Sequence, residues 1–384
     1  MIRKNWKVAI ARDTAVKCLG FHGLHVGFCG IPNVEVVGFF DSKAEDLDDV
    51  MEATKAKRHY RDYLQMLDSE KPDIVVLCSR HPYDHLDQIK AATARGIHIY
   101  CEKPMTVSLK EADEIVELVE AHNIKLCMAH PARYSSAFLQ MKKMIEDGEI
   151  GIPLTIHGRG KSDHRGGGED LMVLGTHILD LEIFFFGQPE SVWAEVRSAG
   201  KPIVKGDICE TIEPIGLTSG DNIFASFSFS NGVRGLFESR RGLFEHGKQR
   251  SPMGIAVIGT EGTLSLRFDD YRDASLKISR SKNPPDVDAC FEDVEVLDER
   301  IIFGAASLDQ SLCGRHTPSA SWFLESNRYG VWDLMRSIEE DRQPVSNIYN
   351  ARTVLEMIYG VYGSQLSRKA IDFPLVDRNN PLGV

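Results

Sequence analysis

The stretch "DIVVLCSRHPYDHLDQIKAATARGIHIYCEKPM" (residues 73–105) decides the fold expected for the first half of the chain. It opens and closes with short apolar runs, 73–78 and 97–101, of the kind that form buried strands. Residues 83–95 between them carry apolar side chains at helical spacing. A strand, a helix and a second strand in this order indicate two parallel strands joined by a helical crossover.

Similar strand-like runs occur on both sides of this stretch. They lie at residues 6–11, 34–41 and 125–129, and amphipathic segments alternate with them. The repeated alternation predicts an α/β fold in which residues 1–130 form an N-terminal Rossmann domain with a parallel doubly wound sheet.

The pattern changes near residue 150. Runs of alternating apolar and polar residues follow one another, separated by turn residues at 219–222 and 231–232. This pattern predicts an α+β domain with a large open antiparallel sheet at residues 131–330. Residues 331–384 return to helical spacing, and these helices are expected to pack back on the first domain.

Composition and charge narrow the class of protein. The chain has 384 residues, a formal net charge of −11 and no basic run, which argues against nucleic acid or a membrane surface as the partner. The eight cysteines show no CxxC pair, which favours free thiols over disulfides or a metal site. The sequence shows no secretory signal and no run of the ~20 apolar residues that a membrane span needs, so we expect a soluble, cytoplasmic protein.

The charged pair Glu102-Lys103, followed by Pro104, ends the second apolar run of the opening stretch. Ser108 and Glu111 have the spacing of a helix capping box, so the pair must lie in the connecting loop. In an open α/β sheet that loop is at the carboxyl edge, where ligands bind. An ammonium there could hydrogen-bond an oxygen of a bound ligand and stabilise negative charge that develops on it. The alternative is a surface ion pair.

The loop after the first strand is the expected place for a cofactor pyrophosphate. It carries Gly20 and Gly23 but no GxGxxG motif, and close helix packing is an alternative reason for these glycines. Asp41 ends the second strand, where an acid can accept hydrogen bonds from an adenosine ribose and repel a 2′-phosphate. Asp41 therefore favours NAD over NADP, although the nearby Lys43 could weaken this preference. The alternative role for Asp41 is to cap the next turn.

A second group of polar residues surrounds an apolar helix that begins near Leu171. Helical spacing puts His177 and Asp180 on one face, and a carboxylate beside an imidazole can raise its basicity. The alternative is a structural role, in which the His177 side chain makes its hydrogen bonds within a helix interface. Four further polar residues are candidate contacts to hydroxyl groups or a carboxylate of a ligand, with solvated surface as their alternative. They are His130, Arg133, His164 and Arg165.

The chain resembles the Gfo/Idh/MocA family of NAD(P)-dependent oxidoreductases. The resemblance rests on the opening stretch, on "PNVEVVGFFD" (32–41) and on "LGTHILDLEIFFFG" (174–187). It implies that Glu102-Lys103-Pro104 is the family's signature lysine motif and that Glu102 holds the loop or the nicotinamide ribose. It also implies that Ser79 and His85 belong to the nicotinamide-side loop, and that His177 acts as acid or base with Lys103. The open face of the sheet would form the interface of a homo-oligomer, a dimer or tetramer.

Two features depart from the family pattern. Many members have an aspartate four residues before the histidine, where this chain has Val173. Asp170 or Asp180 could supply the missing carboxylate, and the sequence leaves this choice open. The first loop also contains extra residues after Ala11, which leaves the alignment of its glycines open.

The resemblance leaves three functions to be weighed. The first is an NAD-dependent dehydrogenase that transfers a hydride between nicotinamide and a sugar, polyol or sugar-like cyclic alcohol. The second is an enzyme that retains NAD and processes glycosides by transient oxidation. The third is a nucleotide-binding sensor without turnover. It is considered because Val173 stands where many family members have an aspartate that takes part in proton transfer. The presence of Lys103 and His177 favours the enzymes.

Overall fold

The computed structural model describes residues 5–15, 22–28, 30–245, 248, 251–268, 275–281, 290–306 and 321–383. The chain divides into two compact units. The first comprises Met1–Tyr134 with Arg300–Arg352, and the second comprises Ser135–Glu299 with Thr353–Val384. The first division lies close to the expected one at residue 130. The segment 331–384, expected to pack on the first domain, is instead shared between the two units.

The first unit contains a six-stranded parallel sheet with the order β3-β2-β1-β4-β5-β6. This order confirms the doubly wound sheet, and the chain reverses its direction of winding between β1 and β4. The two-residue strand β3 was not expected. The strands are β1 (Trp6–Ala11), β2 (Val34–Phe40), β3 (His59–Tyr60), β4 (Ile74–Leu77), β5 (His98–Cys101) and β6 (Leu126–Met128).

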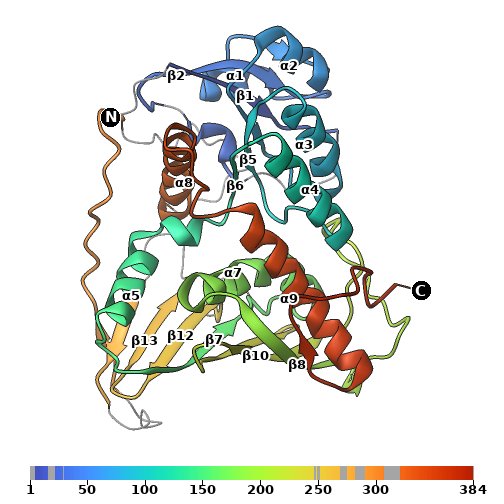
Figure 1. Cartoon of the computed structure of the whole chain (residues 1–384), viewed down its shortest axis with the longest axis vertical. Helices are drawn as coiled ribbons and strands as arrows, with labels where there is room; N and C mark the ends of the chain where they lie inside the picture. Colours follow the sequence, from blue (N-terminus) through green and yellow to red (C-terminus); the bar gives the residue numbers. More distant parts are fainter. Residues whose placement is uncertain are drawn as a thin grey trace. The chain divides into compact units, whose positions relative to one another are not determined.

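Helices cover both faces of this sheet, as Figure 1 shows for α3 and α4 on one side of β5 and α8 on the other. Tyr100 of β5 donates a hydrogen bond to Asn327 Oδ1 of α8 at 2.8 Å, which ties that helix to the sheet. The helices of this unit are α1 (Leu47–Thr54), α2 (Tyr63–Glu70), α3 (His85–Thr93), α4 (Leu109–Ala121) and α8 (Ser321–Glu339), with 3₁₀ turns η1 (Leu24–Val26), η2 (Pro82–Asp84) and η3 (Pro131–Tyr134).

The expected capping box at the start of α4 is half formed. Ser108 Oγ accepts a hydrogen bond from the Glu111 amide at 3.5 Å. The Glu111 carboxylate does not return the bond to Ser108, because it accepts from the hydroxyl of Thr106. Thr106 Oγ1 accepts from the Ser108 amide at 3.2 Å instead. Three residues therefore close the loop that carries Glu102 and Lys103 and start the helix after it.

The second unit contains a ten-stranded sheet in which β7 and β11 are parallel and the other pairs of described strands are antiparallel. This arrangement confirms the mostly antiparallel sheet. The strands are β7 (Pro153–Arg159), β8 (Pro189–Ser198), β9 (Lys201–Pro202), β10 (Asn222–Phe229), β11 (Arg234–Arg240), β12 (Gly254–Gly259), β13 (Thr263–Arg267), β14 (Leu276–Ser279), β15 (Glu292–Asp293) and β16 (Ile371–Asp372).

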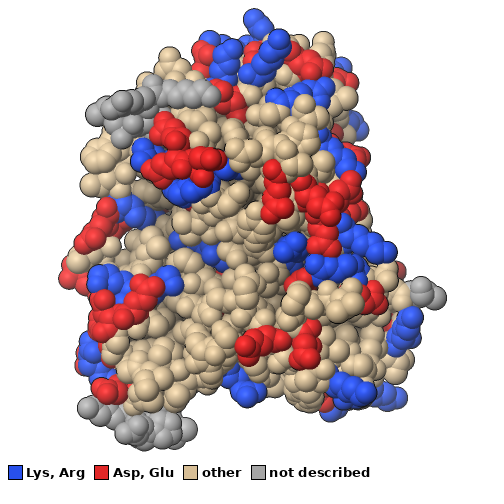
Figure 2. Space-filling model, viewed as in Figure 1, with Lys and Arg blue, Asp and Glu red and all other residues tan. Residues whose placement is uncertain are grey.

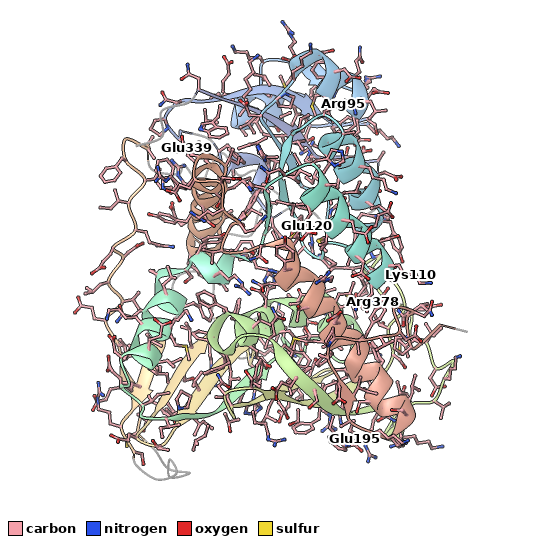
Figure 3. The ribbon with its side chains drawn as sticks, viewed as in Figure 1. Arg95, Lys110, Glu120, Glu195, Glu339 and Arg378 are labelled. Carbon is pink, nitrogen blue, oxygen red and sulfur yellow. The ribbon has the colours of Figure 1, made fainter. Side chains whose placement is uncertain are left out.

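One face of this sheet is covered by helix α7, which lies very close to β7 and β11 (Figure 1). A Cβ atom added at Gly158 of β7 would lie 2.2 Å from Ile178 of α7, so only glycine allows this approach. Arg378 of the C-terminal tail, labelled in Figure 3, pairs with Glu356 of α9. The helices of this unit are α5 (Ser136–Glu146), α6 (Gly168–Val173), α7 (Gly175–Phe186) and most of α9 (Ile348–Ser367).

The other face of the sheet is only partly covered by this chain. Side chains along β10 alternate between buried and half-exposed, and those on the half-exposed side include Phe224. Trp193 of the neighbouring strand β8 is 49% exposed, and its ring lies 6.5 Å from that of Phe224. Glu195 projects from the same strand (Figure 3). Leu236 of β11 and Ile258 of β12 are also half-exposed, and a face with several exposed apolar side chains is typical of a surface that another protein covers.

Charge is distributed without a dominant sign on the face seen in Figure 2, where basic and acidic side chains are interspersed. This distribution agrees with the absence of a basic run in the sequence. Among the described residues, no helix combines the length and apolar character that crossing a membrane requires.

Candidate active site

The Glu102-Lys103 loop lies at the carboxyl end of β5, between β4 and the edge strand β6 of the parallel sheet. Glu102 is 1% exposed and Lys103 is 2% exposed, which rules out the surface ion pair considered for them. The Glu102 amide donates to Leu77 O of β4 at 2.9 Å, so the loop starts in register with the neighbouring strand. Two charged groups buried at the ligand-binding edge of such a sheet indicate a functional site.

His85 joins the two loops that flank this position. Its Nδ1 is 3.0 Å from Met105 O, in the loop after β5, and its Nε2 is 2.9 Å from Ser79 O, in the loop after β4. Ser79 Oγ accepts from the His81 amide at 3.1 Å. Ser79 and His85 therefore build the loop that the resemblance places beside the nicotinamide, and direct contact of either residue with a cofactor stays a prediction.

Two residues that the sequence did not single out stand beside Glu102. His22 Nδ1 lies 3.2 Å from Glu102 Oε1, and Arg80 is close enough to act on the same carboxylate. Burial opposes ionisation of Glu102, but His22, Lys103 and Arg80 outweigh it and hold the pKa of this carboxyl below its usual value. Glu102 is therefore charged at neutral pH.

Asp41 lies where it was expected, directly after β2, and it is fully buried. Its Oδ2 accepts two hydrogen bonds from the Arg12 guanidinium, at 3.1 and 3.0 Å. Its Oδ1 accepts from the Thr14 amide and hydroxyl and from the Lys43 amide. A carboxylate has about four lone-pair sites, so these donors saturate it and fix the start of the first loop. Its role as a ribose acceptor stays a prediction.

The two glycines expected near the pyrophosphate differ in what can be said of them. Gly23 precedes η1 with φ of 77°, a left-handed conformation that favours glycine. Gly20 lies outside the described residues. The NAD-side assignments in this unit therefore depend more on the loops after β4 and β5 than on the first loop.

His130 and Arg133 follow β6, at the same edge of the sheet. Both are buried, so the solvated surface considered for them is wrong. Arg133 lies in η3 and donates to Val345 O at 3.2 Å, which fixes the segment between α8 and α9. Whether either residue contacts substrate stays a prediction.

In the second unit, His177 and Asp180 lie one turn apart on α7, as helical spacing predicted. Both side chains are buried. The imidazole ring of His177 is 6.2 Å from the ring of Phe268, which packs in turn on Phe138. An imidazole in such surroundings is shielded from water, which suits a general base.

Two other acidic residues lie near His177 in the sequence. One already accepts hydrogen bonds from other groups, and the other faces the sheet. Asp170 lies on α6, which ends at Val173, and its oxygens accept from Ser239 Oγ, from the Ser162 amide at 2.9 Å and from the Lys161 amide at 3.3 Å. Glu182 faces the glycines of β7 and β11, and burial raises its pKa well above the usual value. Many family members have an aspartate at the position of Val173. Asp180 is thus the better candidate to take the place of that aspartate beside His177.

Arg165 and His164 are neighbours in the sequence but have different surroundings. The His164 side chain is 66% exposed. The Arg165 side chain is only 10% exposed, and its guanidinium donates to Asp163 Oδ2 at 2.8 Å and to Glu213 Oε1 at 2.8 Å. Arg165 therefore joins the segment before α6 to the loop around Glu213, and solvated surface is the wrong interpretation for it. Substrate contact by either residue stays a prediction.

The triple glycine before α6 serves close packing of the backbone. A Cβ added at Gly166 would lie 2.4 Å from the backbone of Arg241, and one at Gly168 would lie 2.4 Å from Ser219 O. Gly167 has φ of 91°. These contacts explain the glycines better than loop flexibility does, and they fix the segment that leads to His177.

The described cysteines are free thiols. Cys78, Cys101 and Cys127 are buried free thiols, and burial raises the pKa of each above its usual value. The other described cysteines, Cys209 and Cys290, are also unpaired. Within the described part of the chain, no group of three or more histidine, cysteine or acidic residues is arranged to hold a metal ion.

The strand order of the first unit and the buried lysine and glutamate at its carboxyl edge define a dinucleotide-binding oxidoreductase. Residues 22–130 match the family described as "Oxidoreductase family, NAD-binding Rossmann fold", and residues 138–265 match the "GFO/IDH/MocA C-terminal domain". The chain belongs to the Gfo/Idh/MocA family of NAD-binding oxidoreductases, which confirms the family, the cofactor and the class of enzyme that the resemblance implied.

Several characterised proteins are similar to the chain. D-apiose dehydrogenase of Paraburkholderia graminis is 27% identical over 252 residues, which cover 63% of this chain and 63% of the relative. Myo-inositol 2-dehydrogenase of Thermotoga maritima is 22% identical over 62% of this chain and 69% of its own length. The solved structure of levoglucosan dehydrogenase with NADH has a TM-score of 0.73 at 18% identity, over 97% of this chain and 100% of that one.

The residues after β4 and β5 fit a nicotinamide nucleotide. Glu102 Oε2 is buried and has no hydrogen-bond partner among the described residues. A buried carboxylate oxygen is costly to leave without a donor, and a ribose hydroxyl would supply one. Glu102 would thus hold the nicotinamide ribose, with Ser79 and His85 shaping the loop beside it.

Proposed function

We propose that this protein transfers a hydride between NAD and a secondary alcohol of a sugar, a polyol or a sugar-like cyclic alcohol. The observation that carries the proposal is the buried Glu102-Lys103 pair at the carboxyl end of β5, with Glu102 Oε2 left for a ligand. The similarity to dehydrogenases named for apiose, myo-inositol and levoglucosan supports the class of substrate.

Each reacting group has a proposed role. NAD, when bound, supplies the nicotinamide carbon that accepts the hydride. Lys103 donates a hydrogen bond to the substrate oxygen and stabilises the negative charge that develops there. His177 takes the hydroxyl proton, and Asp180 orients the imidazole and stabilises its charged form. Desolvation of His177 and Lys103 keeps these interactions strong.

The remaining polar residues of both units are proposed to bind the rest of the substrate. His130 and Arg133 are buried at the carboxyl edge of the parallel sheet, and their side chains would contact hydroxyl groups. In the second unit, the proposed contacts are His164, whose side chain is exposed, and Asp170, whose carboxylate already accepts a hydrogen bond from Ser239. The acidic groups Asp13 and Asp46 near Asp41 disfavour a 2′-phosphate, so we propose NAD rather than NADP as the working cofactor.

A panel of sugars, polyols and cyclic alcohols tests this function. The purified protein is incubated with NAD and each compound, including apiose, myo-inositol and levoglucosan, and NADH formation is followed by absorbance. We expect a steady rate with at least one class of compound. Cleavage of a glycoside without net NADH would favour transient oxidation instead, and NAD binding without any reaction across the panel would favour a sensor.

We further propose that the protein is a homo-oligomer, a dimer or tetramer, assembled through the half-exposed face of the second sheet. The aromatic pair Trp193 and Phe224 supports this, because two copies related by a two-fold axis would cover it with the same patch.

Replacing Trp193 by glutamate should therefore lower the molar mass measured by light scattering to that of a smaller assembly. Val376 is a matched control, because it is a fully exposed apolar side chain on the C-terminal tail, outside the strands of the sheet. The Val376→Glu variant should keep the mass of the parent. Equal masses for the parent and Trp193→Glu proteins would contradict the proposed interface.

We also propose that the protein works in the cytoplasm. The support is chemical: the described cysteines are free thiols, and a reducing compartment keeps them so.

A further inference from the structure

A histidine from the first loop reaches the Glu102-Lys103 motif. His22 lies just before η1, and its Nδ1 is 3.2 Å from Glu102 Oε1. Its ring also packs edge-on against Phe323 of α8, with the ring centroids 5.5 Å apart. The contact therefore joins three parts of the first unit that are far apart in the sequence. The imidazole is held between the carboxylate and an aromatic ring.

The protonation of His22 determines what it can offer the carboxylate. Burial lowers the pKa of this imidazole below its usual value, although Glu102 acts in the opposite direction. His22 is therefore mostly neutral at pH 7, with one ring nitrogen as donor and the other as acceptor. Because a carboxylate oxygen only accepts, the tautomer with its hydrogen on Nδ1 is the one that can donate to Glu102. Nδ1 is within reach of Oε1 at 3.2 Å, although the hydrogen bond is not formed in this geometry.

The two oxygens of Glu102 are used unequally. Oε1 accepts from the Lys103 amide at 3.1 Å and also has His22 beside it. Oε2 is buried without a hydrogen-bond partner in the described part of the chain. Both contacts that fix the carboxylate therefore converge on one oxygen, and the other oxygen keeps its capacity to accept.

We propose that His22 is a positioning residue that holds Oε1 of Glu102 and thereby presents Oε2 to a hydroxyl group of the nicotinamide ribose. The inference rests on the proposed function, because it takes the Glu102 loop as the nicotinamide side of the site. His22 acts through Glu102 and need not touch the reacting atoms. The first loop, which lacks the GxGxxG motif, would thus contribute to cofactor binding through a side chain.

Two substitutions separate this role from a general effect on the loop. His22→Leu removes the ring nitrogens but keeps an apolar side chain against Phe323. His22→Asn keeps an N–H donor close to the position of Nδ1. Calorimetric titration with NAD and with ADP compares the whole cofactor with a probe that has the adenosine and pyrophosphate but no nicotinamide ribose. Thermal unfolding of each variant verifies that it is folded.

We expect His22→Leu to weaken NAD binding by about tenfold, the lower range for loss of one hydrogen bond to a charged group. ADP affinity should stay within about twofold of the parent, and His22→Asn should recover most of the loss for NAD. If His22→Leu does not fold, His22→Gln replaces it with the same expected loss, because its N–H moves toward the position of Nε2.

A double-mutant cycle with Glu102→Gln completes the test. If His22 acts through Glu102, adding His22→Leu to Glu102→Gln should cause little further loss of NAD affinity. Additive losses, an equal fall in ADP affinity, or no difference between the asparagine and leucine variants would each overturn the inference. A parent protein that binds ADP but not NAD would overturn the proposed function itself, whereas equal NAD binding by the parent and His22→Leu would overturn only the role of His22.

Discussion

Replacing Lys103 by alanine should lower kcat by roughly 100-fold or more, equivalent to about 2.7 kcal/mol of transition-state stabilisation. The reason is that the proposed reaction builds negative charge on the substrate oxygen, and Lys103 is the cation that the family motif provides there. The residue is buried at the carboxyl end of β5, where an ammonium acts more strongly than in water. Steady-state kinetics on the best substrate found in the panel measure the loss.

Binding of NAD should change far less than turnover, because adenosine and pyrophosphate contacts do not involve Lys103. Titration of NAD into both proteins separates the two effects. A kcat within about threefold of the parent would contradict the catalytic role of Lys103, since the corresponding free energy is no larger than that of an exposed ion pair.

Lys125 provides a matched control in the same sheet. It is also buried, but it precedes β6 and therefore lies at the amino edge of the strands, where it pairs with Asp341 at 2.8 Å. Lys125→Ala removes a buried ammonium without touching the carboxyl edge. It should leave kcat close to that of the parent even if it lowers stability, and thus shows that a lost buried lysine alone does not reduce turnover.

Five of the six strands of the first unit could be predicted from sequence because each lies in a mainly apolar run. The run 6–11 coincides with β1, and the runs at 73–78 and 97–101 contain β4 and β5. Strand β3 could not be found in this way, because its two residues are half-exposed and paired only with β2. A periodic signal needs more residues than such a strand has.

The break between α6 and α7 could not be predicted from the sequence either. Apolar residues continue through Leu174, so the spacing indicates one helix, whereas the structure has two. The difference matters for the choice of carboxylate, because Asp170 belongs to the first helix and binds Ser239 instead of facing His177 along one helix. Tertiary contacts of this kind override a local pattern.

Several site residues have partners too distant in the chain for spacing to indicate. His22 and Glu102 are 80 positions apart, and Arg165 and Glu213 are 48 apart. The motif identified Glu102 and the polar cluster identified Arg165, but neither reveals its partner. Arg12 and Asp163 were missed altogether, although each is charged and follows directly or closely after a strand, which is the one signal that could have marked them.

Removing the Arg165 guanidinium should destabilise the second unit by about 3 kcal/mol, the lower range for breaking a buried ion pair. Arg165→Met keeps an unbranched side chain but removes the guanidinium from the buried carboxylates of Asp163 and Glu213. Denaturant unfolding followed by fluorescence measures the difference. Arg159 is a matched control, because its guanidinium is 52% exposed and lies 3.6 Å from Glu238. Arg159→Met should cost less than about 1 kcal/mol.

The pH dependence distinguishes this ion-pair role from a role in substrate binding. Burial opposes ionisation of Asp163, but Arg165 outweighs it and holds the pKa of Asp163 below its usual value. The stabilisation is thus complete above the unfolded-state pKa near ~4 and is lost as the pH falls through the lower folded-state pKa. The parent and Arg165→Met should therefore differ most at neutral pH and converge in acid. If Arg165 served the substrate alone, the variant would unfold like the parent at every pH and show only a raised KM, which would contradict this prediction.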